Sequence, residues 1–210
     1  MDDMILYEEK KHRGFKCSVY YDPDPMSPDD WDTLGTIYSG HRNYNPQKHK
    51  MEEIIEYDED GNWHVDKDYL YVLIYYYDHG GLCLWSRMEP QRCGWDEGLF
   101  GLMAVHKDKA AMEFGDLSNP ENYERAMNCL DAEVKCWDTY VRGEVYGYVI
   151  EDEDGCEVES CWGFYDYPDD VMEEAVFIAD GMADRREKAE REEAERVEKY
   201  EMICEPFWID

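Results

Sequence analysis

The chain has 210 residues, of which 43% are hydrophobic and 15% aromatic. This composition is typical of a globular protein and excludes a disordered chain. Its 52 acidic and 21 basic residues give a formal net charge of -31, and such a field repels phosphates. The longest basic cluster lies between Lys10 and Lys16 and is too small to overcome that field. We therefore expect no direct binding to nucleic acid and a basic protein as partner.

The cysteines and the apolar runs indicate the cellular compartment of the protein. Eight cysteines are present, and the N-terminus carries acids where a secretory signal has bases. The thiols are therefore expected to be reduced. The longest uncharged apolar stretch, Tyr69–Tyr77, is about half of the roughly 20 residues that cross a bilayer. We expect a cytoplasmic protein without a membrane segment.

The first part of the chain alternates and then turns. Phe15–Tyr21 has the alternation of a strand, and three prolines in the following segment favour a turn. Between Pro46 and Tyr57, the side chains of Met51, Ile54 and Ile55 have helical spacing. This spacing predicts a helix over Pro46–Tyr57, ended by the turn at 58–62.

The middle of the chain predicts a sheet. Tyr69–Tyr77 is rich in aromatic and β-branched residues, which favours a central strand. The pair Gly80-Gly81 can turn it back into Leu82–Trp85, and Leu99–Val105 is another apolar run. We predict a hairpin and a further strand.

A helix and a second hairpin follow. Asn119-Pro120 begins a segment that ends at Gly143 and has apolar residues at steps of three or four. Glu144–Ile150 and Glu157–Tyr165 alternate around an acidic turn, which predicts antiparallel neighbours.

After Pro168 the chain is predicted to be helical. Val171, Ala175, Ile178 and Met182 form one apolar stripe that can dock on the rest of the protein. The segment from 184 to 201 is charged, and three acid-first pairs with i,i+4 spacing stabilise it: Glu187 with Arg191, Glu192 with Arg196, and Glu195 with Lys199. We predict an α+β fold, with helices packed on an antiparallel sheet. The expected division is a body at 1–167 and a C-terminal helix and tail at 168–210.

The acidic turns and the cysteines do not fit known metal motifs. In a calcium loop with Gly61 at its sixth position, Lys67 would occupy the position of the bidentate ligand. With Gly155 there, Ile150 would be the first ligand. The cysteines lack the two-residue spacing of a zinc knuckle. We expect no metal and no cofactor.

One group of residues has the types needed for catalysis. Asp78 and His79 follow the predicted central strand, and Cys93 and Asp96 are close in sequence. A histidine beside an acid can serve as a base for a thiol. Aspartate and glycine are equally typical of a plain hairpin turn. An enzyme or metal protein centred on these four residues is therefore an alternative hypothesis.

Four blocks together resemble a known family. They are WDTLGTIYSGHRNYN at 31–45, YYYDHGGLCLW at 75–85, CGWDEGLFGLMAVHKDK at 93–109, and the segment at 137–170 that contains SCWGFYDYPDD. As a set they resemble small proteins encoded by bacteriophages and other mobile elements, a family that brings no agreed activity. The chain departs from it in its long charged C-terminal helix and in having one cysteine before the last strand, where a pair of cysteines is expected in other members. The matching polar residues are Trp31, Asp32, His41, Arg42, Asp78, His79, Cys93, Trp95, Asp96, Ser160, Cys161 and Trp162.

The resemblance and the charge lead to one functional hypothesis. Phages often encode compact acidic proteins that occupy the nucleic-acid groove of host nucleases. We expect an anti-CRISPR or anti-restriction inhibitor that mimics nucleic acid and binds a host nuclease or its nucleic-acid-binding subunit in the bacterial cytoplasm. A scaffold that self-associates through the terminal helix, as in a homodimer, is the third alternative. The expected contacts are Glu151, Asp152, Glu153, Asp154, Glu157, Glu159, Asp169, Asp170, Glu173 and Glu174.

Overall fold

The computed structural model describes residues 4–204, with side chains up to Glu201. The chain forms two compact units. The terminal unit combines the N-terminal residues up to Pro23 with the residues from Val145 onward, and the central unit spans Asp24–Glu144. This division differs from the expected boundary at 167/168, because the long C-terminal helix completes the core of the terminal unit.

The predicted α+β class is confirmed. The described residues contain three α-helices and sheets in which all but one strand pair is antiparallel. No helix in the described part of the chain has the length and apolar character that a bilayer crossing requires.

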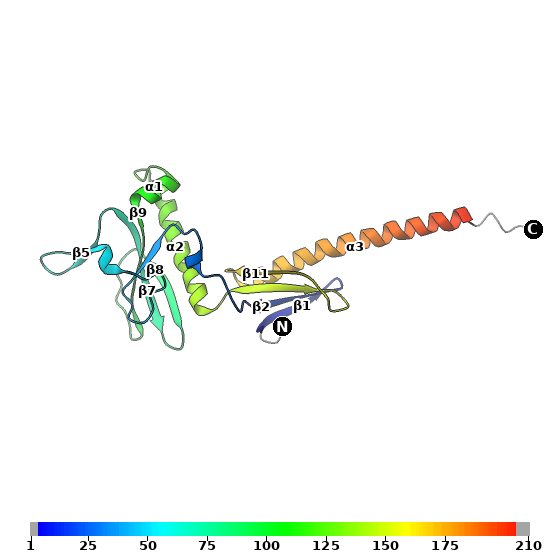
Figure 1. Cartoon of the computed structure of the whole chain (residues 1–210), viewed down its shortest axis with the longest axis horizontal. Coiled ribbons are helices and arrows are strands. Elements are labelled where there is room, and N and C mark those ends of the chain that lie inside the picture. The colour runs from blue at the N-terminus through cyan, green and yellow to red at the C-terminus, as the bar shows by residue number, and fades with distance from the viewer. Residues whose placement is uncertain (1–3, 205–210) are drawn as a thin grey trace, which may run out of the picture. The chain divides into compact units, whose positions relative to one another are not determined.

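The terminal unit is a four-stranded antiparallel sheet with one helix on it. The strand order is β1-β2-β10-β11. The helix α3 runs along one face of this sheet and continues well past its end (Figure 1). The predicted strand at 15–21, the second hairpin and the C-terminal helix are confirmed, whereas β1 was not foreseen. The bounds are Leu6–His12 for β1, Phe15–Tyr21 for β2, Tyr146–Glu151 for β10, Glu157–Phe164 for β11 and Pro168–Cys204 for α3.

The alternation of the two central strands makes the core of this unit. On β2 every second side chain, beginning with Phe15, faces the helix, and on β10 Tyr146, Tyr148 and Ile150 do the same. Small residues of α3 allow the helix to approach the sheet closely, because they add little bulk at the interface. The buried residues of α3 in this cluster are Val171, Met172, Ala175, Ala179 and Ala183.

A network of ion pairs fixes α3 to the turn between β1 and β2. The Arg13 guanidinium lies 3.0 Å from Asp180, 2.7 Å from Asp184 and 2.8 Å from Glu187. The His12 imidazole lies 2.7 Å from the same Asp180 carboxylate. These contacts hold the pKa of Asp180 below its ordinary value, first through His12 and then through Arg13. Two members of the longest basic cluster, His12 and Arg13, are therefore engaged internally.

The charged part of α3 pairs differently from the sequence prediction. Glu187 contacts Arg13 instead of Arg191, because the turn before β2 reaches the helix. The ion pairs along the described helix are Arg186 with Glu190, Lys188 with Glu192, and Arg196 with Glu193. The three expected acid-first pairs are not among them.

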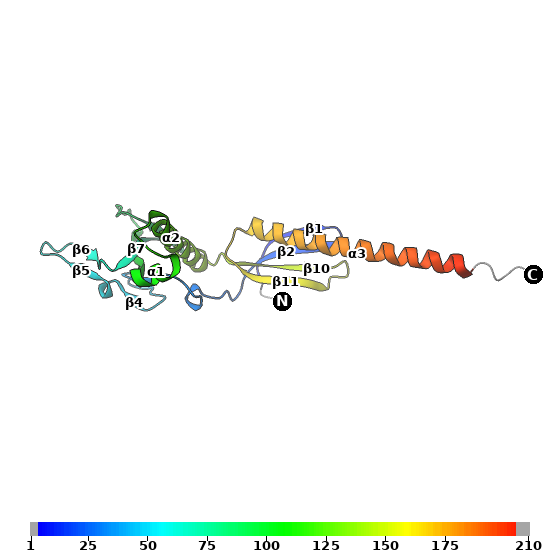
Figure 2. The ribbon, with the colours of Figure 1, turned by 90° about the horizontal axis from the view of Figure 1, so that it is seen from above.

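The central unit contains a five-stranded sheet with the order β4-β3-β9-β7-β8 and a separate β5-β6 hairpin. Figure 2 shows the same elements from above. The long strand β7 lies between β8 and β9, as predicted for a central strand, and the expected hairpin of β7 with β8 is present. The bounds are Thr36–Ser39 for β3, His49–Lys50 for β4, Ile55–Tyr57 for β5, Trp63–Val65 for β6, Tyr69–Asp78 for β7, Leu82–Arg87 for β8 and Glu97–His106 for β9.

The helix predicted over Pro46–Tyr57 is wrong. The segment forms β4, a single 3-10 turn at Met51–Glu53 and β5. Met51 and Ile54 are buried in a cluster with side chains of β7 and β9. One 3-10 turn is enough to bring Met51 and Ile54 to the sheet. Tertiary packing therefore explains their spacing without a longer helix.

The predicted helix at 119–143 is confirmed as α2, Pro120–Arg142, which is preceded by the short helix α1, Lys107–Phe114. The Asn119 side chain accepts the N–H of Glu121 at 3.0 Å, and Gly143 ends the helix in the left-handed conformation. The inward face of α2 packs on the sheet through Ala126, Met127, Leu130, Val134 and Trp137.

A half-buried carboxylate ties the WDTLGT block to α2. Glu133 accepts the N–H of Leu34 at 2.5 Å and the N–H of Gly35 at 2.8 Å. Burial raises the pKa of Glu133, and the two N–H donors oppose that rise. A side chain at position 35 would lie 2.6 Å from the Met103 sulfur, so the close approach requires glycine.

We expect Glu133→Ala to lower the free energy of unfolding by roughly 1–3 kcal/mol, because it leaves two part-buried N–H groups unpaired. Glu133→Gln keeps one acceptor oxygen and should lose less. Urea denaturation of both variants measures the difference. A Glu133→Ala protein as stable as the parent would contradict this role.

We expect Asp180→Asn to destabilise the protein at neutral pH and not in strong acid. The folded pKa of Asp180 lies below the ordinary value of 3.8 for this side chain, so its contribution is present above that value and disappears as the pH falls through the folded pKa. Urea midpoints measured from pH 7 downward test this. Glu198→Gln, an exposed change on the same helix, is the control and should show no such pH dependence.

Candidate functional site

The predicted acidic contacts lie on three consecutive parts of the terminal unit. Asp152 and its neighbours form the turn between β10 and β11, Glu157 and Glu159 are on β11, and Asp169 to Glu174 occupy the first two turns of α3. Residues 151–174 contain eleven acids and neither lysine nor arginine. This run therefore has no basic side chain of its own to compensate its acids.

Three of the ten predicted contacts have internal roles. Glu151 forms an ion pair with Lys16 across the sheet. Glu153 lies 3.2 Å from the Arg186 guanidinium. Asp152 accepts the N–H groups of Asp154 and Cys156 at 3.0 and 2.9 Å, which stabilises the turn. These carboxylates are less available to a partner than the sequence suggests.

The other seven form no ion pair in the described part of the chain. Glu157 accepts the Ser160 hydroxyl at 2.7 Å and remains exposed. Asp169 and Asp170 lie in the first turn of α3, where the helix dipole favours them. These seven exposed carboxylates are Asp154, Glu157, Glu159, Asp169, Asp170, Glu173 and Glu174.

Two of these acids, which lie on different elements, contribute to the raised pKa of one buried hydroxyl. The pKa of Tyr148 is raised to about 12, first by burial and then by negative groups that include Glu174 of α3 and Glu159 of β11. The strand and the helix therefore direct negative charge to the same side of the sheet. We call the seven exposed carboxylates the acidic surface.

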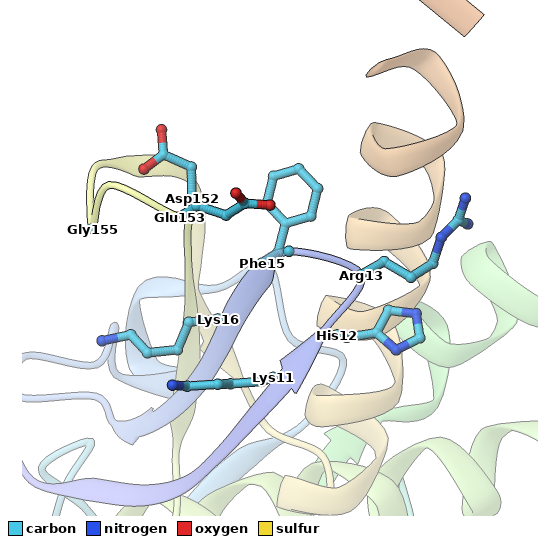
Figure 3. Close-up of a pocket in the computed structure, with 9 residues that line it drawn as sticks. Lys11, His12, Arg13, Phe15, Lys16, Asp152, Glu153 and Gly155 are labelled. Atoms are coloured by element: carbon cyan, nitrogen blue, oxygen red, sulfur yellow. The ribbon is translucent and has the colours of Figure 1, made fainter. Parts of the chain in front are cut away.

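A hollow of about 490 Å³ lies where the basic cluster meets the β10–β11 turn. Figure 3 shows Lys11 and Lys16 on one side of it, and His12 and Arg13 on the other. Lys16 pairs with Glu151, and His12 and Arg13 pair with acids of α3. Three of its four basic side chains, His12, Arg13 and Lys16, therefore already have carboxylate partners, and Asp152 and Glu153 also line the hollow, so it does not favour a phosphate.

The structure brings together three of the four residues of the alternative catalytic set. In the central unit, His79 Nδ1 lies 3.2 Å from the Asp96 carboxylate, and the Asp78 N–H donates to the Asp96 carbonyl at 3.0 Å. Cys93 is exposed, and no bond joins it to His79 within residues 4–204. His79 is itself 72% exposed. The set therefore lacks the enclosed thiol and base that a nucleophilic mechanism needs.

A cleft that the sequence did not predict lies next to Asp78. It has a volume of about 540 Å³ and is lined by His41, Asn43, Tyr44, Asp78 and Tyr140, among others. His41 Nδ1 accepts the Tyr44 N–H at 3.1 Å, which fixes the imidazole in place. The lining residues come from three of the four resemblance blocks. Membership in these blocks was the only indication of the cleft in the sequence, and it did not show which residues lie together in the structure.

Three of the described cysteines, Cys93, Cys156 and Cys161, are exposed free thiols. Among residues 4–204 no three histidine, cysteine or acidic side chains gather as metal ligands would. Cys204 lies where side chains are not described. Comparisons with protein-family models, with curated proteins and with solved structures gave no match.

We expect an alkylating reagent to label Cys93, Cys156 and Cys161 quickly in the native protein and Cys17 only after unfolding. Cys17 is fully buried, and burial raises the pKa of its thiol, which leaves less reactive thiolate. Peptide mapping by mass spectrometry after timed labelling measures the four rates. Rapid native labelling of Cys17 would contradict the described core.

Proposed function

We propose that this chain is an acidic inhibitor that binds the basic nucleic-acid-binding surface of a host defence nuclease, of the CRISPR or restriction type. The observation that carries the proposal is the acidic surface. Residues 151–174 have eleven acids without one lysine or arginine, and seven exposed carboxylates in this segment form no ion pair among the described residues.

The chain has few cations, and their placement supports this function. Lys16, Arg13 and Arg186 compensate acids that hold the β1–β2 turn, the β10–β11 turn and α3 together. The acidic surface receives none of them. Unpaired like charges oppose compaction through self-repulsion, so a surface of this kind has a cost that folding alone does not explain. Binding to a basic groove would relieve that repulsion.

The electrostatics of such binding favour a nuclease as the target. Carboxylates on a rigid strand and helix take the place of backbone phosphates in a channel lined by lysine and arginine. Opposite potentials speed association and suppress wrong partners. The resemblance of the four sequence blocks to phage-encoded proteins supports a target in host defence. The distal part of α3 is a weaker candidate, because its acids alternate with bases of the same helix.

We expect the protein to bind one or more nucleases of a CRISPR and restriction panel at low salt, and to compete there with the nuclease's own nucleic acid. A variant with Glu157→Gln, Glu159→Gln, Glu173→Gln and Glu174→Gln should bind at least about tenfold more weakly, because each change removes one unpaired charge from the interface. Affinity is measured by titration over a range of salt concentrations, since screening weakens exposed charge pairs.

The control variant removes four charges elsewhere. Glu52→Gln, Glu59→Gln, Asp60→Asn and Glu124→Gln are all exposed positions of the central unit, and together they change the net charge by the same amount. The control should bind like the parent. Equal weakening of both variants would mean that overall charge, not the acidic surface, governs binding. No binding to any nuclease at low salt would refute the proposal.

A further inference from the structure

The last strand of the terminal sheet has an open edge. β11 pairs with β10 on one side and with no described strand on the other. It is eight residues long, and six of its residues are exposed. A strand edge of this length offers unpaired N–H and C=O groups to another chain.

The features that usually protect such an edge are weaker here than on the opposite side of the sheet. The other edge strand, β1, carries Lys10 and Lys11, and α3 packs over β1, β2 and β10. β11 has no lysine and no proline. Its two register shifts against β10 lie near its ends. The stretch from Glu159 to Trp162 pairs with β10 without a register shift.

The two faces of β11 differ in chemistry. Glu159 and Cys161 stand opposite Ile150 and Tyr148, whose side chains face α3. Ser160 and Trp162 stand opposite Val149 and Gly147 on the other face. A side chain at Gly147 would lie 2.2 Å from the Trp162 ring, so the indole lies flat over this glycine. Trp162 is nevertheless 37% exposed.

A neighbouring strand would therefore meet the Glu159 carboxylate on one face and the Trp162 ring on the other. The added strand that fits has lysine or arginine at every second position and apolar residues between them, because cross-strand pairs of opposite charge and of apolar groups both stabilise a sheet. A second copy of β11 does not fit. It would bring the acids of both copies onto one short ladder, where like charges repel.

We propose that β11 is the docking edge for an extended basic strand of the partner, which adds to the sheet as its fifth strand. This inference rests on the proposed function and specifies its mode. Main-chain hydrogen bonds supply part of the affinity, while Glu159 and Trp162 select the alternating pattern. The acids of α3 remain available to the cations that flank the docked strand.

The probe is a synthetic peptide of eight residues in which lysine alternates with valine, blocked at both ends. Two control peptides keep its charge. One is N-methylated at two adjacent central residues, which removes donors from both of its edges, and the other has the four lysines followed by the four valines. Each is titrated against the full chain at low salt by fluorescence anisotropy, and amide hydrogen exchange of β11 is followed by NMR.

We expect the alternating peptide to bind at least about tenfold more tightly than either control and to slow the exchange of outer-edge amides of β11. The variant Glu159→Gln should weaken the alternating peptide more than the N-methylated one, because only a docked strand places a lysine beside that carboxylate. Equal affinity for all three peptides, or unchanged exchange in β11, would overturn the docking edge. That result would leave the proposed function standing, since nuclease binding and its loss in the four-charge variant are measured independently.

Discussion

The ion pairs of Arg13 with three carboxylates of α3 are the interaction on which the terminal unit depends. They join the turn between β1 and β2 to a helix that begins more than 150 residues later in the chain. In a protein with 52 acids and 21 bases, most acids lack a cation, so the position of each base decides which acids are compensated. Here the bases compensate Asp180 and its neighbours on the helix, which stabilises the docking of α3. The acids between 154 and 174 stay uncompensated as a consequence.

Much of the fold could be predicted because its signals are local. Alternation predicted β2 and the β10–β11 hairpin, and steps of three and four predicted α2 with its Asn119 and Gly143 ends. The helix predicted over 46–57 was wrong, since the same spacing of Met51 and Ile54 is produced by one 3-10 turn packed on a sheet. The joining of both chain ends in one unit has no local signal. It follows from burial between segments that are distant in sequence.

The residues of the candidate site could be predicted from the sequence, but their ion pairs and contacts could not. The charge pattern identified the acidic segment, but it could not separate Glu151 and Glu153, which have basic partners, from Glu157 and Glu159, which have none. That distinction depends on Lys16 and Arg186, which lie on other elements. Likewise, closeness in sequence placed Cys93 with His79, whereas the loop before β9 brings Asp96 to the imidazole instead. Pairing across a sheet or between loops is a tertiary property.

The distribution of charge also accounts for how an open strand edge can persist in a stable protein. An exposed edge without lysine or proline invites pairing with another copy of itself. On β11 the acids Glu157 and Glu159 oppose that pairing, because two such edges would repel each other at short range. The same acids attract a strand of opposite charge. Repulsion between copies and attraction to a basic strand thus arise from one feature, so an edge that disfavours self-pairing stays available to a strand of opposite charge.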